Sequence, residues 1–224
     1  MILVFEDATF SIYSFPDRWA QPDVTGLVED LHSTLNYYRA LLHDTTERKI
    51  TIYAHTHETY RSDDVAGIAD PFAFSFDFIC CDRFLAAHEM AHLMVYARAG
   101  GQPRPFLDEG MAELLANWNE VKAAAPFADH AVPDFPCASS ASIDDIYSGA
   151  GFWDHAWDFN ESYPMAAQFT AVAIARSSLD RYLSEYYVPG RLGTSEDGDS
   201  RLHSFIGMGF HEMRTEMKRA AGCN

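Results

Sequence analysis

The sequence has no long hydrophobic run, and no stretch approaches the roughly 18 consecutive apolar residues that a transmembrane helix requires. The N-terminal segment MILVFEDATF has no basic region before its apolar residues, and Glu6 and Asp7 interrupt those residues early. This pattern predicts a first β-strand rather than a signal peptide. We therefore expect no association with a membrane.

Basic residues are also few. The chain has 16 Lys and Arg residues against 33 Asp and Glu residues, which gives a formal net charge of −17 at pH 7. A surface with this balance repels nucleic acids and anionic lipids, so we expect neither as a partner. The charge is compatible with neutral or cationic substrates, although solubility alone also accounts for it.

The four cysteines lack the spacing of a Cys-x-x-Cys motif. Cys80 and Cys81 end a predicted strand, where neighbouring side chains point to opposite faces, so a disulfide between them would require unusual strain. Cys137 and Cys223 are the other two. This arrangement of the cysteines favours free thiols in a reducing compartment and predicts a cytoplasmic protein.

Hydrophobic periodicity divides the 224 residues into a β-containing N-terminal half and a helical C-terminal half. Strands are predicted within residues 2–14, at 49–54 and at 71–79. Helices are predicted at about 23–42, at 82–99, from 108 onward, at 164–187 and at 201–220. We expect one α+β domain over residues 1–224, with lobes of about 1–100 and 101–224 and helix 82–99 at their junction.

The segment His88-Glu89-Met90-Ala91-His92 lies in the predicted helix 82–99. Residues four apart share a helix face, so both imidazoles can reach one cation, while Glu89 projects about a quarter-turn away, toward a water on that cation. His88, Glu89 and His92 follow the apolar stripe of the helix and are predicted to be buried, where ionisable groups need a partner such as a metal. Chance alone gives HExxH in a chain of this length on the order of a few per cent of the time.

A second acidic segment follows, in which sixteen residues separate His92 from Glu109. The segments FLAAHEMAHLMVY and PRPFLDEGMAELLA together resemble those of the peptidase-MA-like family of gluzincins, over about residues 25–187. The resemblance implies a zincin-like fold with the metal helix at a cleft. It also implies one zinc ion held by His88, His92 and Glu109. Glu113 would be the carboxylate that orients a ligand histidine.

The same resemblance implies a zinc metallopeptidase, a hydrolase in which Glu89 is the general base for a metal-activated water. It assigns oxyanion stabilisation to a residue beyond the third ligand, which is Tyr163 here, with His155 and Tyr147 as alternatives. The strand before the metal helix is predicted to be an edge strand that binds a peptide or small amide substrate, with Ala73 and Ser75 on its open face. Phe72, Phe74, Phe76 and Phe78 would face the core.

Other interpretations stay open at the level of sequence. The same site could belong to a zinc-dependent tailoring enzyme with a non-peptide substrate, or to a binding protein that retains a metal site without catalysis. Glu89 argues against the binding protein, because metal retention alone needs no general base. The absence of a Gly-x-Met-x-Asn motif gives no support to specificity for a free N-terminus. A second histidine pair, His55 and His57, could hold another metal or could lie at a solvated strand end.

Overall fold

The computed structural model describes residues 1–15, 21–56, 66–101, 103–121, 132, 135–147, 152–153, 159–188 and 197–223. These residues form two compact units, Met1–Arg98 and Ala99–Asn224. The described strands lie in the first unit, which also contains two helices, and the second unit is helical. The protein is therefore of mixed α and β structure, as the sequence predicts. None of the helices in the described part of the chain is both long enough and apolar enough to cross a membrane.

The first unit is built on a five-stranded mixed sheet with the order β1-β2-β3-β5-β4. Its strands are β1 (Ile2–Glu6), β2 (Phe10–Ser14), β3 (Ile50–His55), β4 (Gly67–Asp70) and β5 (Ser75–Ile79). β2, β3 and β5 are parallel, whereas β1 and β4 pair antiparallel at the two ends. In β3 the residues Ile50, Ile52 and Ala54 are fully buried and alternate with partly exposed ones, so one face of the sheet is apolar.

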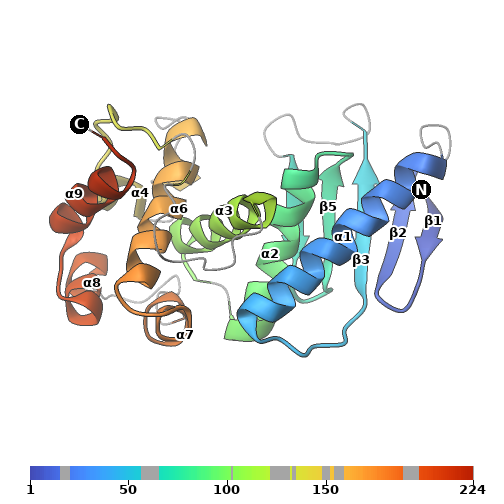
Figure 1. Ribbon diagram of the computed structural model, residues 1–224, viewed down its shortest axis with the longest axis horizontal. Helices are drawn as coiled ribbons and strands as arrows, with labels where there is room; N and C mark the ends of the chain where they lie inside the picture. Colours follow the sequence, from blue (N-terminus) through green and yellow to red (C-terminus); the bar gives the residue numbers. More distant parts are fainter. Residues whose placement is uncertain are drawn as a thin grey trace. The chain divides into compact units, whose positions relative to one another are not determined.

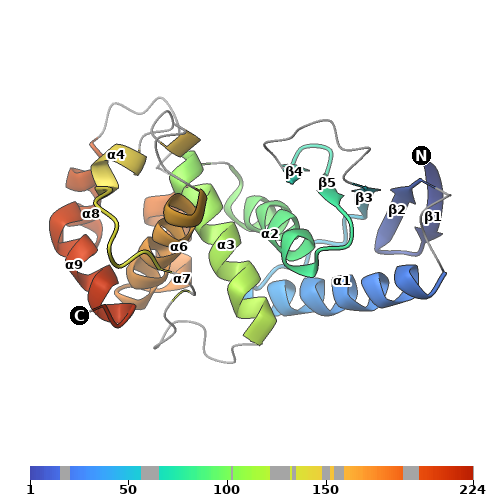
Figure 2. The ribbon, with the colours of Figure 1, turned by 90° about the horizontal axis from the view of Figure 1, so that it is seen from above.

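Two helices, α1 (Gln21–Leu42) and α2 (Arg83–Ala99), cover this face of the sheet (Figures 1 and 2). The Tyr38 hydroxyl of α1 donates a hydrogen bond to the Ala87 carbonyl of α2 over 3.1 Å, which joins the two helices. The Asp82 carboxylate accepts from the backbone N–H groups of Phe84 and Leu85 and caps the start of α2. α2 ends at Ala99, as predicted, and Gly100, with a φ of 75°, follows it.

The phenylalanine-rich segment differs from its prediction. Phe74, Phe76 and Phe78 are buried, but Phe72 lies in the turn between β4 and β5 and is 75% exposed. β5 is not an edge strand, because Ser75 pairs with Thr51 on one side and Asp70 on the other. The strand at this end of the sheet is β4. Ala73, the other residue predicted to bind substrate, lies in the same exposed turn as Phe72.

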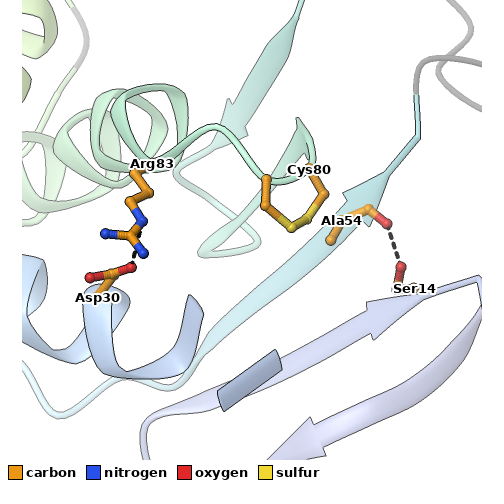
Figure 3. The surroundings of a disulfide bond; sticks show 6 residues. Ser14, Asp30, Ala54, Cys80 and Arg83 are labelled. Atoms are coloured by element: carbon orange, nitrogen blue, oxygen red, sulfur yellow. Dashed lines mark hydrogen bonds and ion pairs between the residues drawn. A yellow bond between two sulfur atoms is a disulfide. The ribbon is translucent and has the colours of Figure 1, made fainter. Parts of the chain in front are cut away.

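The cysteines are paired, which the sequence did not predict. Cys80 and Cys81 are joined by a disulfide (Figure 3), and Cys137 and Cys223 form a second one with a Cα–Cα distance of 5.5 Å. The adjacent pair lies in a turn after β5, so the alternation of side chains along a strand does not apply to it. Nearby, Arg83 of α2 forms an ion pair with Asp30 of α1 (Figure 3).

The second unit consists of α3 (Pro105–Val121), α4 (Ile143–Tyr147), α6 (Phe159–Ala175), α7 (Leu179–Arg181), the π-helix η2 (Tyr182–Tyr187), α8 (Gly198–Ile206) and α9 (Phe210–Ala220). Each of the two long helices predicted here is broken. The Ser178 side chain starts a new helix by accepting from the Arg181 N–H, and Gly207, with a φ of 75°, ends α8.

An aromatic cluster forms the core of this unit. Its buried members come from four helices and include Phe106, Tyr147, Phe169 and Phe210. α3 packs closely on α6, because a Cβ added at Gly110 would lie 2.5 Å from the Ala166 carbonyl oxygen. Glycine at position 110 therefore sets how near the two helices approach.

Candidate metal centre

The HExxH segment occupies the middle of α2, as the sequence predicts. His88, Glu89 and His92 are 6%, 5% and 8% exposed. Because the histidines are one helical turn apart, their imidazoles meet, and the two Nε2 atoms are 3.2 Å apart. Two buried ring nitrogens therefore face one another on α2.

This spacing tests whether the pair fits a metal. A tetrahedral zinc ion with Zn–N distances of about 2.0–2.1 Å holds two ligand nitrogens about 3.3 Å apart. The Nε2–Nε2 distance of 3.2 Å agrees with that value. The donor set also fits, since imidazole nitrogens with a carboxylate oxygen are common zinc ligands. The residues present are therefore suited to zinc.

The β4 strand approaches the third residue of this segment, Glu89, at Gly67. A Cβ added at Gly67 would lie 2.8 Å from both Cδ and Cγ of the Glu89 side chain. No side chain could occupy that position without displacing the carboxylate, so glycine allows the backbone of β4 to pass directly beside Glu89. The carboxylate predicted to act as a base thus lies next to the last strand of the sheet.

α3 carries the predicted third ligand and its neighbour on the same face. Glu109 is the fifth residue of this helix and is partly exposed. Glu113 lies one turn later, and Asn117 Nδ2 donates hydrogen bonds to the Glu113 carbonyl and to its Oε1, over 2.8 and 3.3 Å. The orienting role expected of Glu113 stays a prediction.

A buried tyrosine contacts the residue that precedes Glu109. Tyr187 of η2 is 1% exposed, and its hydroxyl donates to Asp108 Oδ1 over 2.6 Å. Burial raises the pKa of Tyr187 well above its ordinary value, and the nearby carboxylates of Asp108 and Glu109 raise this pKa further. Tyr187 therefore keeps its proton and acts as a hydrogen-bond donor.

The candidates for oxyanion stabilisation have different surroundings. Tyr163 lies near the start of α6, partly exposed, with its ring packed 5.4 Å from that of Phe152. Tyr147 is a core residue instead, since its ring is buried within the aromatic cluster. His155 lies outside the described residues. The role proposed for Tyr163 stays a prediction.

The second histidine pair is described only in part. His55 Nε2 lies 3.3 Å from Asp77 Oδ1, on neighbouring strands of the sheet. His57 lies outside the described residues. His55 thus has a carboxylate partner on β5.

Two residues of this region were not singled out from the sequence. Gly67 had a signal that could have been used, because an isolated glycine in a strand often marks a close backbone approach. No local sequence signal indicates the contact between Tyr187 and Asp108, because 79 positions separate the two residues.

Comparison with known proteins gives no further assignment. No model of a known protein family matches the chain, and no curated protein matches it significantly.

Proposed function

We propose that the protein is a zinc-dependent hydrolase, a metallopeptidase of the gluzincin type with one zinc ion per chain. The observation that carries this proposal is the buried pair of Nε2 atoms 3.2 Å apart on α2, with the buried Glu89 beside it. Two facing imidazoles provide two of the ligands that a catalytic zinc site requires, and the carboxylate suits the general base.

Glu109 is proposed as the third ligand. His88, His92 and Glu109 are a set of side chains able to hold one metal ion. Two histidines and one glutamate form a known type of catalytic zinc site, which leaves a coordination position for water or substrate.

A zinc ion in this set would polarise the scissile carbonyl and lower the pKa of a bound water toward neutrality. The Glu89 carboxylate accepts a proton from the attacking water and then delivers it to the leaving amine. The low exposure of Glu89 restricts solvent around its carboxylate and favours the proton transfer to the substrate. Glu89 is thus the residue on which turnover depends, whereas the histidines and Glu109 determine metal retention.

The substrate is proposed to bind as an extended peptide along β4. β4 ends the sheet, and no other described strand pairs with its outer side. The free N–H and C=O groups of such an edge can pair with an added strand. Because Gly67 brings this strand to Glu89, a peptide paired with β4 would pass the base. β4 replaces the Phe-rich strand in this role.

Metal analysis and two substitutions test the proposal. The purified protein should contain or take up one zinc per chain and should hydrolyse members of a peptide library, with activity lost to a chelator. Glu89→Gln should keep zinc and lose several orders of magnitude in turnover. Glu109→Ala should lower zinc affinity itself.

Two results would contradict the proposal. A chain that takes up no zinc cannot work in this way. Near-normal hydrolysis by Glu89→Gln would show that Glu89 is not the general base. If small non-peptide amides or esters are hydrolysed and peptides are not, the zinc site stands and the peptide substrate is wrong.

A further inference from the structure

Glu109 lies between two residues that fix the first turns of α3 against other helices of the second unit. On one side, Asp108 accepts the hydrogen bond from the buried Tyr187 hydroxyl over 2.6 Å. On the other side, Gly110 lies against the Ala166 carbonyl of α6, with no space for a Cβ. The backbone around Glu109 is therefore held at both neighbouring positions.

Asp108 and Glu109 are adjacent carboxylates, and either could in principle bind a divalent cation. On a helix their side chains point about 100° apart, so a rotation of the first turn would exchange one for the other. A hydrogen bond from a tyrosine to a carboxylate is charge-assisted and short, and it restrains both the side chain and the turn that carries it. The contact with Tyr187 thus directs Asp108 toward η2.

We propose that Tyr187 is a positioning residue for the metal centre: through Asp108 it holds the first turns of α3 so that Glu109 is offered to the zinc ion. The inference rests on the proposed function, since it requires zinc at His88, His92 and Glu109. In this role Tyr187 acts through Asp108 and is not itself a ligand of the metal. Its effect is on the affinity for the metal, by keeping the ligand in place before the metal binds.

The location of Tyr187 in a π-helix fits this role. η2 contains three tyrosines with fully or almost fully buried side chains, Tyr182, Tyr186 and Tyr187. The wider turn of a π-helix changes the direction of the side chains that follow it, and such segments are frequent at functional sites. Among these tyrosines, Tyr187 donates to Asp108, whereas Tyr182 shares a hydrogen bond with the neutral Thr170 hydroxyl over 3.2 Å.

Tyr182 provides a matched control. Tyr187→Phe and Tyr182→Phe each remove one buried hydroxyl and one hydrogen bond from the same short helix. A purely structural role predicts that both variants lower the unfolding temperature of the metal-free protein and leave zinc affinity equal. The positioning role predicts that zinc affinity falls in Tyr187→Phe alone.

The experiment measures the zinc dissociation constant of the full chain by competition with a chromophoric chelator, together with thermal unfolding of the metal-free form. We expect Tyr187→Phe to weaken zinc binding by roughly 10–100-fold, the usual loss when a residue that supports a ligand is removed. Tyr182→Phe should stay within about twofold of the wild type, since the Tyr182 hydroxyl bonds Thr170 and not Asp108, so the hydrogen bond that holds Asp108 remains.

Two further variants test whether Asp108 carries the effect, and they also serve if Tyr187→Phe does not fold. Asp108→Asn keeps an oxygen that can accept the hydrogen bond but removes the charge that strengthens it, so it should lose clearly less zinc affinity than Asp108→Ala. Asp108→Ala removes the acceptor and should lose as much affinity as Tyr187→Phe. Combined with Tyr187→Phe it should lose no more, because the two residues act as one unit.

The possible outcomes separate the two proposals. A wild-type chain that takes up no zinc overturns the proposed function and this inference with it. Zinc uptake by the wild type with equal affinities in Tyr187→Phe and Tyr182→Phe overturns the positioning role alone. A loss in Asp108→Asn as large as in Asp108→Ala would also contradict it, because the charge and not the hydrogen bond would then matter.

Discussion

Gly67 offers a sharp test of the arrangement around Glu89. In Gly67→Ala the new Cβ would lie 2.8 Å from Cδ and Cγ of Glu89, whereas ordinary contacts begin at 3.4 Å. For Cδ and Cγ alone the difference is 3.4 − 2.8 = 0.6 Å, and Oε1 would lie closer still, so the carboxylate or the strand must move by more than 0.6 Å. Since Glu89 is 5% exposed, its side chain has little space in which to do so.

Two effects of this substitution should be measurable. A misplacement of about 1 Å at a catalytic group can cost about 10²-fold in rate, so a shift of this size should lower kcat by roughly tenfold or more. Overpacking of a buried site costs about 1–3 kcal/mol of stability. Zinc content should be unchanged, because the proposed ligands are His88, His92 and Glu109, whereas the added Cβ meets Glu89. Peptide hydrolysis, metal analysis and denaturant unfolding give the three readouts.

Gly26→Ala is the control for this substitution. A Cβ added at Gly26 meets no atom within 4 Å, and the residue lies inside α1. Alanine in place of glycine in a helix should leave activity unchanged and raise stability by about 0.5–1 kcal/mol. If Gly67→Ala behaves like this control in both rate and stability, β4 does not approach Glu89 and the proposed path of the substrate is wrong.

Two other predictions concern Tyr163 and Glu216. Tyr163→Phe should lower kcat by roughly 10²-fold with little change in KM if its hydroxyl stabilises the oxyanion, whereas near-normal steady-state turnover would limit Tyr163 to its packing against Phe152. Hydrogen bonds from Arg219 and Arg176 lower the pKa of Glu216 from 4.5 to about 2. A lowered folded-state pKa stabilises the fold above about pH 4.5, and this contribution is lost as the pH falls toward 2. Glu216→Gln should therefore lose less stability than the wild type as the pH falls between these values. If both proteins lose the same free energy of unfolding over this range, the ion pairs of Glu216 with Arg176 and Arg219 do not contribute.

The residues predicted from local periodicity agree best with the structure. The spacing of His88 and His92 determines that they share a helix face. Asp82 caps the start of this helix, and Gly100 follows its end. α2 therefore begins and ends almost where the sequence predicts. The burial of both histidines and of Glu89 also follows from the apolar stripe around them.

The errors arise where contacts distant in sequence decide the structure. β4 has only four residues, with glycine, alanine and aspartate among them, and it is a strand because it pairs with β5. Phe72 lies outside the strand because the Asp70 carboxylate accepts hydrogen bonds from the N–H groups of Phe72 and Ala73, which forms a turn there. The Asp-Pro pair at 70–71 was a usable signal of that turn.

The disulfides show the same limit. Cys137 and Cys223 are 86 positions apart, and no local pattern can pair them. The interruption of the predicted helix 164–187 is another example. Its apolar periodicity continues through the break, where the Ser178 side chain caps the next helix by accepting from the Arg181 N–H.

The close packing at Gly110 also limits how this region can vary between related sequences. Any side chain at position 110 would collide with the α6 backbone at Ala166, within 2.7 Å of its carbonyl carbon, so a change there requires α6 to be displaced as a whole. Such a displacement would carry Tyr163 with it, because Tyr163 lies on the same helix one turn before Ala166. Related chains should therefore keep glycine at position 110 wherever they keep the path of α6, whereas the exposed residues of α3 are free to differ. The positions of residues 109 and 163 relative to one another would then be the same in those related chains.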